Sequence, residues 1–211
     1  VQVASEELKK DASVDLIIGN NRKAELADIL DARLAEKNEE NRVYVLDIAH
    51  THEYERLHLD RLGGHTRAFI KVQDGCNQFC SYCIIPYTRG RVRSRRPEDV
   101  EEEVKILAEE GYKEIVLTGI HLTSYGIDFK DEGIDFLTLI KRLHEIDGIE
   151  RIRFGSLEPR VITEEFASEL SRLPKICPHF HLSLQSGCDD TLKRMNRHYT
   201  CEEYADRCEI L

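Results

Sequence analysis

The sequence predicts an α/β protein whose core is a parallel sheet. From residue 67 onward, short apolar segments with the character of strands alternate with longer amphipathic segments that have helical periodicity. Parallel neighbours need a crossover connection, and helices of this length supply one. The sequence therefore predicts a partial β/α barrel, preceded by the C-terminal part of an N-terminal α/β domain.

Residues 1–50 form the first predicted unit. Helical patterns occupy 4–10 and 23–36, and apolar runs typical of strands occupy 14–20 and 42–48. This order of elements indicates part of an α/β domain rather than a complete one.

Residues 51–66 are predicted to link the two units. The segment has no sustained period, is rich in histidine and charge, and contains Gly63 and Gly64. Its histidines have neither paired spacing nor a cysteine partner, so we interpret it as a solvated linker rather than a metal site.

The barrel is predicted over 67–211. Pro97 stands near the first position of one helix, followed by acidic residues that suit a helix N-terminus, and Thr163 opens another. The predicted strands are 67–72, 114–120, 151–157 and 179–185, and the predicted helices are 97–111, 134–148, 163–173 and the remainder of the chain.

The composition is that of an ordinary globular protein. Hydrophobic residues make up 41% and charged residues 33% of the 211 positions, which excludes the disordered and fibrous classes. The formal net charge of −10 argues against generic adhesion to nucleic acid, although a local basic patch remains compatible with it. No apolar run approaches membrane-spanning length, and VQVASEELKK at the start is no secretory signal, so we expect a cytoplasmic protein with no membrane partner.

Functional groups are predicted to gather where the strands end, because ligands bind at the carboxyl ends of parallel strands. Polar or metal-binding residues follow or end each of four predicted strands. These groups are the cysteine loop after 67–72, Gly119 with His121, Ser156 with Glu158, and Gln185 with Ser186.

The cysteine loop is the most specific motif. Three of the seven cysteines, Cys76, Cys80 and Cys83, follow the spacing C-x3-C-x2-C. In a reducing compartment this indicates metal ligation, and three thiolates can each hold one iron of a cubane cluster while the fourth iron stays open. The alternative is a zinc site with a fourth ligand such as His65 or His121. The other four cysteines share no tight spacing, and we interpret them as buried or incidental thiols.

Five arginines follow the loop directly. They can bind a phosphate backbone, or they can be solvated and pair with the acidic helix that comes next. His121 likewise has two interpretations, as a ligand contact or as a hydrogen-bonded residue that fixes its loop. The arginines are Arg89, Arg91, Arg93, Arg95 and Arg96.

The loop GCNQFCSYC, with the aromatic Tyr82 before its last cysteine, resembles that of the radical S-adenosylmethionine enzymes. The resemblance implies a [4Fe–4S] cluster on Cys76, Cys80 and Cys83, with S-adenosylmethionine chelating its open iron and being cleaved to a 5′-deoxyadenosyl radical. It implies further that Tyr82 lies against the adenine and Gly119 admits the methionine moiety. Glu158 and Gln185 are then candidates for polar contacts to the cofactor.

Several separated motifs resemble the methylthiotransferase subgroup of that family. The resemblance implies a methylthio group installed at C2 of N6-threonylcarbamoyladenosine, position 37 of tRNA, with the anticodon loop and an external electron donor as partners. It also implies RNA contacts for Arg89, Arg91 and Arg93. Relatives acting on N6-isopentenyladenosine-37 or on a ribosomal protein differ around 118–125 and 155–159. The motifs are DGCNQFCSYCIIPY, CIIPYTRGRVRSR, LTGIHLTSYG, RIRFGSLEPR and HFHLSLQSGCDDTLKRMNRHYT.

The chain also departs from the family pattern. The family has an N-terminal domain whose three cysteines bind a second [4Fe–4S] cluster, whereas residues 1–50 contain no cysteine. We expect an internal fragment: a remnant of that domain over 1–50, and a truncated radical S-adenosylmethionine domain over 67–211. Such a fragment would bind one cluster without completing methylthiolation. A zinc-stabilised, non-catalytic RNA-binding module is the alternative from another class, and the sequence does not predict the oligomeric state.

Overall fold

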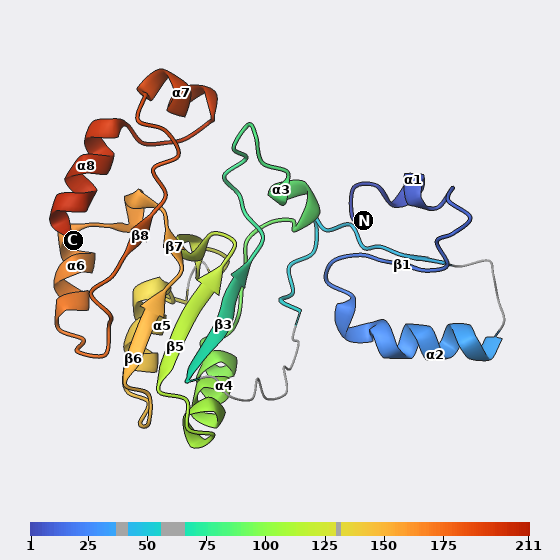
Figure 1. The fold of residues 1–211 in the computed structure, drawn as a ribbon, viewed down its shortest axis with the longest axis horizontal. Coiled ribbons are helices and arrows are strands. Elements are labelled where there is room, and N and C mark those ends of the chain that lie inside the picture. Colours follow the sequence, from blue (N-terminus) through green and yellow to red (C-terminus); the bar gives the residue numbers. More distant parts are fainter. Residues whose placement is uncertain (37–41, 56–65, 130–131) are drawn as a thin grey trace.

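The computed structural model describes residues 1–36, 42–55, 66–129 and 132–211. The N-terminal unit contains one small parallel sheet in which Ile17 lies opposite Val43. In Figure 1 this unit lies to one side of the larger sheet. Its elements are α1 (Ser5–Leu8), β1 (Ile17–Ile18), the 3-10 turn η1 (Lys23–Glu25), α2 (Leu26–Glu36) and β2 (Val43–Tyr44). The predicted α/β character of residues 1–50 is present, with strands much shorter than the apolar runs.

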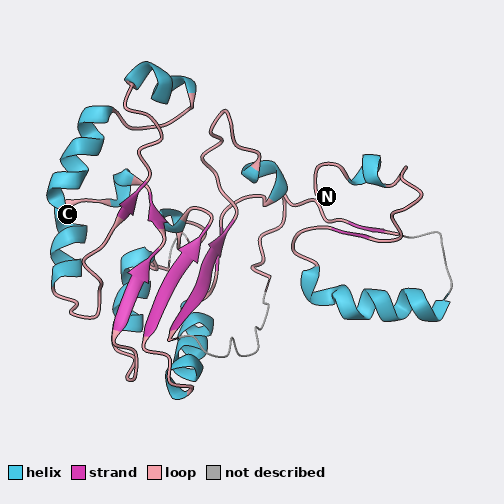
Figure 2. Cartoon of the chain, viewed as in Figure 1, coloured by secondary structure: helices cyan, strands magenta, loops and turns pink. Residues whose placement is uncertain are grey.

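The central sheet has four strands in the order β4-β3-β5-β6. Three of them, β3 (Arg67–Asp74), β5 (Glu114–Gly119) and β6 (Arg151–Phe154), are parallel, as the alternating pattern predicts. The register shifts between Lys71 and Gln73, which brings Val72, Gln73 and Asp74 all into buried positions at the end of β3. Figure 2 shows these strands side by side with helices around them.

Two helices pack against one face of this sheet and close the core. They are α4 (Pro97–Glu109) and α5 (Phe136–His144). Pro97 is at the helix start as predicted, and the Asp135 side chain caps α5 by accepting from the Thr138 amide. Fully buried Ile70, Ile115 and Leu139 are typical of the contacts that hold the layers together.

The predicted strand 151–157 is wrong as a single element, because it divides at Gly155. β6 stays beside β5, and the Gly155 amide donates to the Leu117 carbonyl at 2.8 Å. The next residues form β7 (Ser156–Leu157), which pairs in parallel with β8 (His181–Leu182) instead. A Cβ at Gly155 would lie 3.3 Å from the Leu117 carbonyl oxygen, so a glycine suits this close approach of the two backbones. The chain changes direction at Gly155 and continues toward β8.

The remaining elements lie around the strand ends. The short helix α3 (Ile85–Thr88) and the antiparallel strand β4 (Arg93–Ser94) follow the cysteines and were not predicted. The others are the 3-10 turns η2 (Leu122–Ser124) and η3 (Pro159–Val161), and the helices α6 (Glu164–Ser171), α7 (Asp189–Arg194) and α8 (Cys201–Ile210). Thr163 caps α6 as predicted, and Thr200 with Glu203 forms a capping box at α8.

Residues 56–65, most of the predicted linker 51–66, lie outside the described residues. The described part of that segment packs rather than standing free in solvent: the Tyr54 hydroxyl donates to the Lys71 carbonyl at 2.8 Å. Glu55 accepts from the Ala24 amide at 3.0 Å, which ties the same segment to the N-terminal unit. Among the described helices, none is long and apolar enough to cross a membrane.

Candidate active site at the carboxyl ends of the strands

The cysteine loop begins where β3 ends, and Gly75 makes its first turn. Gly75 has a φ of 72°, and a Cβ there would lie 1.8 Å from the Arg91 carbonyl oxygen. The next amide, that of Cys76, donates to the Gly90 carbonyl at 3.0 Å. Only glycine allows the two limbs of the loop to approach so closely.

The three thiols differ in burial and in hydrogen bonding. Cys76 is buried and Cys80 and Cys83 are half-buried, all with free thiols. Burial raises the pKa of the Cys76 thiol, while the Gln78 amide donates to its Sγ at 3.5 Å. Nη1 of Arg197 donates to Sγ of Cys80 at 3.3 Å. Two of the three sulfurs therefore already accept hydrogen bonds, as ligand thiolates do.

The donor set fits an iron–sulfur cluster. Within the described ranges, no three or more His, Cys, Asp or Glu side chains converge on one point where a metal ion could bind. A cluster carries its thiolates on separate irons, so it does not require such convergence. His65, one candidate fourth ligand for zinc, lies outside the described residues.

Tyr82 and Gln185, both predicted to contact a cofactor, lie together. The Tyr82 hydroxyl donates to Oε1 of Gln185 at 3.0 Å. Gln185 has a φ of 67°, a left-handed conformation that is uncommon outside glycine. Tyr82 is 54% exposed, so the residue is accessible to a ligand.

Gly119 lies against a buried amide rather than open space. A Cβ at Gly119 would come within 2.9 Å of Oε1 of Gln73. That oxygen accepts from the His121 amide at 2.8 Å, and Nε2 of Gln73 donates to the carbonyls of Asp74 and Gly75. Gln73 therefore joins the end of β5 to the start of the cysteine loop, and Gly119 leaves room for it.

Glu158 is buried and directed at Arg160. Its Oε1 accepts from Nε of Arg160 at 2.7 Å, and the carboxylate also caps η3. Nη2 of Arg160 in turn donates to Oε1 of Gln78 at 3.1 Å. Glu158 thus reaches the cysteine loop through an arginine that the sequence analysis did not select.

His121 is positioned by its own loop. Its Nδ1 lies 2.7 Å from the Ser124 hydroxyl, and burial lowers the pKa of the imidazole, so it is neutral near pH 7. Nε2 is buried and has no hydrogen-bond partner among the described residues. Both earlier interpretations of His121 therefore retain support.

The arginines divide into internal and external groups, and the expected RNA contact of Arg93 is not supported. Arg93 is 1% exposed. Its guanidinium donates to the Arg89 carbonyl at 2.8 Å and lies 3.7 Å from the Asp74 carboxylate, because β4 turns it inward. Arg89 is half-buried and 3.6 Å from the same carboxylate. Arg91 is exposed, with its guanidinium 4.5 Å from the Phe79 ring centroid.

The next two arginines both contact the acidic helix that follows them, as the second interpretation expects. Arg95 forms a salt bridge with Glu103 of α4, and Arg96 lies 3.7 Å from Glu98 of α4 and 2.8 Å from Glu132, which is outside that helix.

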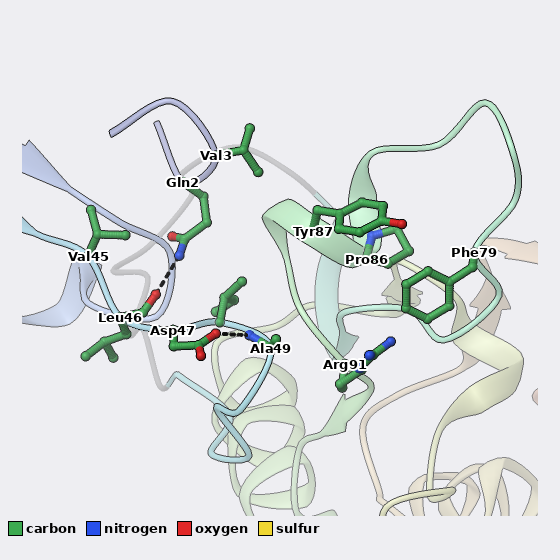
Figure 3. Close-up of a pocket in the computed structure, with 11 residues that line it drawn as sticks. Gln2, Val3, Val45, Leu46, Asp47, Ala49, Phe79, Pro86, Tyr87 and Arg91 are labelled. Atoms are coloured by element: carbon green, nitrogen blue, oxygen red, sulfur yellow. Dashed lines mark hydrogen bonds between the residues drawn. The ribbon is translucent and has the colours of Figure 1, made fainter. Parts of the chain in front are cut away.

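A cavity of about 390 Å³ separates the N-terminal unit from the loop. Figure 3 shows Phe79, Tyr87 and Arg91 on one side and Val3 and Leu46 on the other. Aromatic and cationic side chains from the cysteine loop and from the residues after it therefore line a hollow that faces the N-terminal unit.

The sequence patterns did not single out three residues of this site, namely Arg197, Arg160 and Gln73. Arg197 lies in the quoted stretch HFHLSLQSGCDDTLKRMNRHYT, but no spacing rule connects it to a cysteine 117 positions earlier.

A three-cysteine loop at the end of a parallel strand is typical of one class of protein, the radical S-adenosylmethionine enzymes. Residues 70–211 match the Radical SAM superfamily, and the chain belongs to that superfamily. Its sequence is 43% identical over 205 residues to the threonylcarbamoyladenosine tRNA methylthiotransferase MtaB of Aquifex aeolicus, covering 97% of this chain and 49% of the relative. It is 41% identical to the MtaB of Bacillus subtilis, covering 100% and 46%.

The name of a third relative gives a different nucleoside. The tRNA-2-methylthio-N(6)-dimethylallyladenosine synthase of Clostridium botulinum is 39% identical over 198 residues, covering 94% of this chain and 43% of the relative. These similarities confirm the methylthiotransferase resemblance read from the motifs. The chain spans about half the length of each of these relatives.

Solved structures share the fold. The apo form of OxsB, a cobalamin-dependent S-adenosylmethionine radical enzyme, superposes with a TM-score of 0.62 at 15% identity, covering 92% of this chain and 31% of that one. The radical S-adenosylmethionine methyltransferase TsrM of Kitasatospora setae gives 0.54 at 21% identity, covering 68% and 28%. At these identities the likeness concerns the α/β fold with its parallel strands.

Proposed function

We propose that this chain is the catalytic core of a tRNA methylthiotransferase that modifies C2 of N6-threonylcarbamoyladenosine at position 37. The observation that carries the proposal is the placement of Cys76, Cys80 and Cys83 at the end of β3, with Gln185 brought onto Tyr82 beside them. A parallel sheet presents its ligand site at this edge.

In this proposal Cys76, Cys80 and Cys83 hold a [4Fe–4S] cluster and leave one iron open. Together with S-adenosylmethionine, the cluster supplies radical chemistry able to remove hydrogen from an unactivated carbon, using an electron from an external donor. The exposed Tyr82 ring supports the adenine, and Gln185 orients the Tyr82 hydroxyl. Glu158, held by Arg160, offers a buried polar edge near the loop.

The target base must reach this edge of the sheet. An adenine in a duplex is inaccessible, whereas a base of the anticodon loop can unstack and enter a pocket. In this proposal Arg91, which is exposed, and half-buried Arg89 contact the phosphate backbone beside the cysteines. We expect the reaction to take place in the cytoplasm.

The substrate assignment rests on the motif LTGIHLTSYG and on the MtaB relatives at 43% and 41% identity. The alternative substrate, N6-isopentenyladenosine-37, is supported by the relative at 39% identity. Nucleoside analysis decides between them: tRNA from a deletion strain carrying the full-length gene should regain the methylthiolated threonylcarbamoyl nucleoside. Recovery of the isopentenyl product, or a methylthiolated ribosomal protein, would replace this assignment.

Cluster binding separates the enzyme from a zinc-stabilised RNA-binding module. Anaerobic reconstitution with iron and sulfide should give a brown protein that reductively cleaves S-adenosylmethionine. Cys80→Ala should abolish cluster loading, whereas Cys208→Ala, an exposed thiol of α8, should leave it unchanged. A colourless protein with stoichiometric zinc would contradict the proposal.

We propose further that residues 1–211 alone hold one cluster and do not complete methylthiolation. Residues 1–50 contain no cysteine, so they supply no ligand for a second cluster. Methylthiolated tRNA formed by these residues alone would contradict this.

A further inference from the structure

The segment 194–197, at the end of α7, lies directly against the cysteine loop. This contact brings together parts of the chain that are more than a hundred positions apart. Its hydrogen bonds run from Ser81 N to Met195 O (3.1 Å), from Ser81 Oγ to Arg194 O (2.8 Å), and from Asn196 Nδ2 to the carbonyls of Gln78 and Phe79 (3.1 Å each).

Within this segment, the Arg197 guanidinium is fixed on the Cys80 sulfur. Its carbon lies 5.1 Å from the Tyr199 ring centroid, while Nη1 reaches Sγ of Cys80 at 3.3 Å. The ring cannot shift easily, because Tyr199 is 5% exposed and its hydroxyl donates to the carbonyls of Ser183 and Leu184 at 2.7 Å.

The hydrogen bonds within the described residues do not satisfy all of the donors of the Arg197 guanidinium. Nε of Arg197 is buried and has no hydrogen-bond partner in the described part of the chain. Arg197 as a whole is half-buried, and an incompletely paired guanidinium that is partly withdrawn from water costs free energy unless an anion compensates it. The atom it meets is the sulfur of an expected ligand thiolate, which carries that negative charge when a cluster is bound.

We propose that Arg197 is a positioning residue that hydrogen-bonds the Cys80 thiolate and raises the reduction potential of the cluster. The inference rests on the proposed cluster site. One-electron reduction changes [4Fe–4S]²⁺ to [4Fe–4S]¹⁺ and adds a negative charge that is shared with the ligand sulfurs. A charge-assisted hydrogen bond to one of these sulfurs stabilises the reduced form more than the oxidised form, so reduction becomes easier.

The test is an anaerobic titration of the reconstituted protein with dithionite as electron donor, followed by electron paramagnetic resonance. In Arg197→Gln we expect the equilibrium constant for reduction to fall about tenfold, a shift of about 59 mV toward more negative potential. Arg197→Lys should shift in the same direction by less, because it keeps the charge and loses the planar fork.

Arg194→Gln is the matched control. It removes the same charge from the same segment, but Arg194 is exposed and donates to Asp190 O and Thr191 Oγ1 rather than to sulfur. We expect the midpoint reduction potential of the cluster in Arg194→Gln to stay close to that in the unchanged protein.

The outcomes separate the inference from the function on which it rests. Equal midpoint potentials for Arg197→Gln and Arg194→Gln, at equal iron content, would overturn the role of Arg197 and leave the cluster proposal standing. If Arg197→Gln takes up no iron, Arg197→Lys decides in the same way. An unchanged protein that binds no cluster would overturn both.

Discussion

The hydroxyl of Tyr82 donates to Oε1 of Gln185 at 3.0 Å, although 103 positions separate the two residues. Tyr82→Phe removes this hydrogen bond and keeps the ring, so S-adenosylmethionine affinity should change by less than about fivefold. Tyr82→Ala also removes the ring face and should weaken affinity by at least about tenfold. Equilibrium dialysis of the reconstituted protein measures both, and equal affinities for the two variants would refute an adenine contact by Tyr82.

The same substitution should affect tRNA binding at exposed Arg91 and folding stability at buried Arg93. Arg91→Gln should weaken tRNA binding and reduce the slope of log K against log salt by about 1, because one phosphate contact is lost. Filter binding at several salt concentrations measures this slope. An unchanged slope would mean that Arg91 makes no phosphate contact.

Arg93→Gln serves as the comparison because the side chain is 1% exposed and holds Asp74 and two loop carbonyls. It should leave the salt slope unchanged and lower the free energy of unfolding by about 2 kcal/mol, because Asp74 loses a buried partner. Chemical denaturation checks the stability, and a reduced slope in this variant would reopen the RNA role of Arg93.

Gly75 should tolerate alanine far less well than Gly111 does. Both have positive φ, of 72° and 93°, so alanine strains both by about 1 kcal/mol. A Cβ at Gly75 would also meet the Arg91 carbonyl oxygen at 1.8 Å. A Cβ at Gly111 would have no heavy atom of the described residues within 4 Å, apart from those of its own neighbours in the chain. Gly75→Ala should therefore melt lower than Gly111→Ala and load less iron. Similar melting temperatures would contradict the close approach.

Glu114 should make the stability of the fold depend on pH below 5. Burial alone raises the pKa of this carboxyl, but hydrogen bonds from Arg151 and Arg153 outweigh burial and lower the pKa from 4.5 to about 2. The folded pKa lies below the ordinary value, so the stabilisation is complete above about pH 4.5 and is lost as the pH falls toward 2.

The shift corresponds to about 3 kcal/mol at neutral pH. Glu114→Gln should therefore be less stable than the unchanged protein at pH 7, with the difference shrinking toward pH 2.5. Urea unfolding at both pH values measures this, and a difference independent of pH would show that the three surrounding arginines do not stabilise the carboxylate. Those arginines are Arg67, Arg151 and Arg153.

Local signals in the sequence predicted the features that local chemistry determines. The cysteine spacing predicted the loop, and Pro97 and Thr163 predicted the starts of two helices. The alternation of short apolar segments with longer amphipathic ones predicted the three parallel strands. Each depends on residues within a few positions of one another, so pattern rules can detect it.

The remaining features depend on contacts distant in sequence. Arg93 belongs to a run of cations that resembles a solvated turn, and only its pairing in β4 opposite Asp74 turns it inward. Gly155 divides the predicted strand 151–157 because β7 finds its partner at β8 rather than β5. Tertiary pairing overrides local propensity in both places.

The hydrogen bonds between Ser81 and the segment 194–197 have a dynamic consequence. A cofactor that stiffens residues 76–83 should slow amide hydrogen exchange at the end of α7, far away in the sequence, because opening either segment requires breaking the same bonds. Binding of the cofactor could then be detected as slower amide hydrogen exchange in the C-terminal part of the chain.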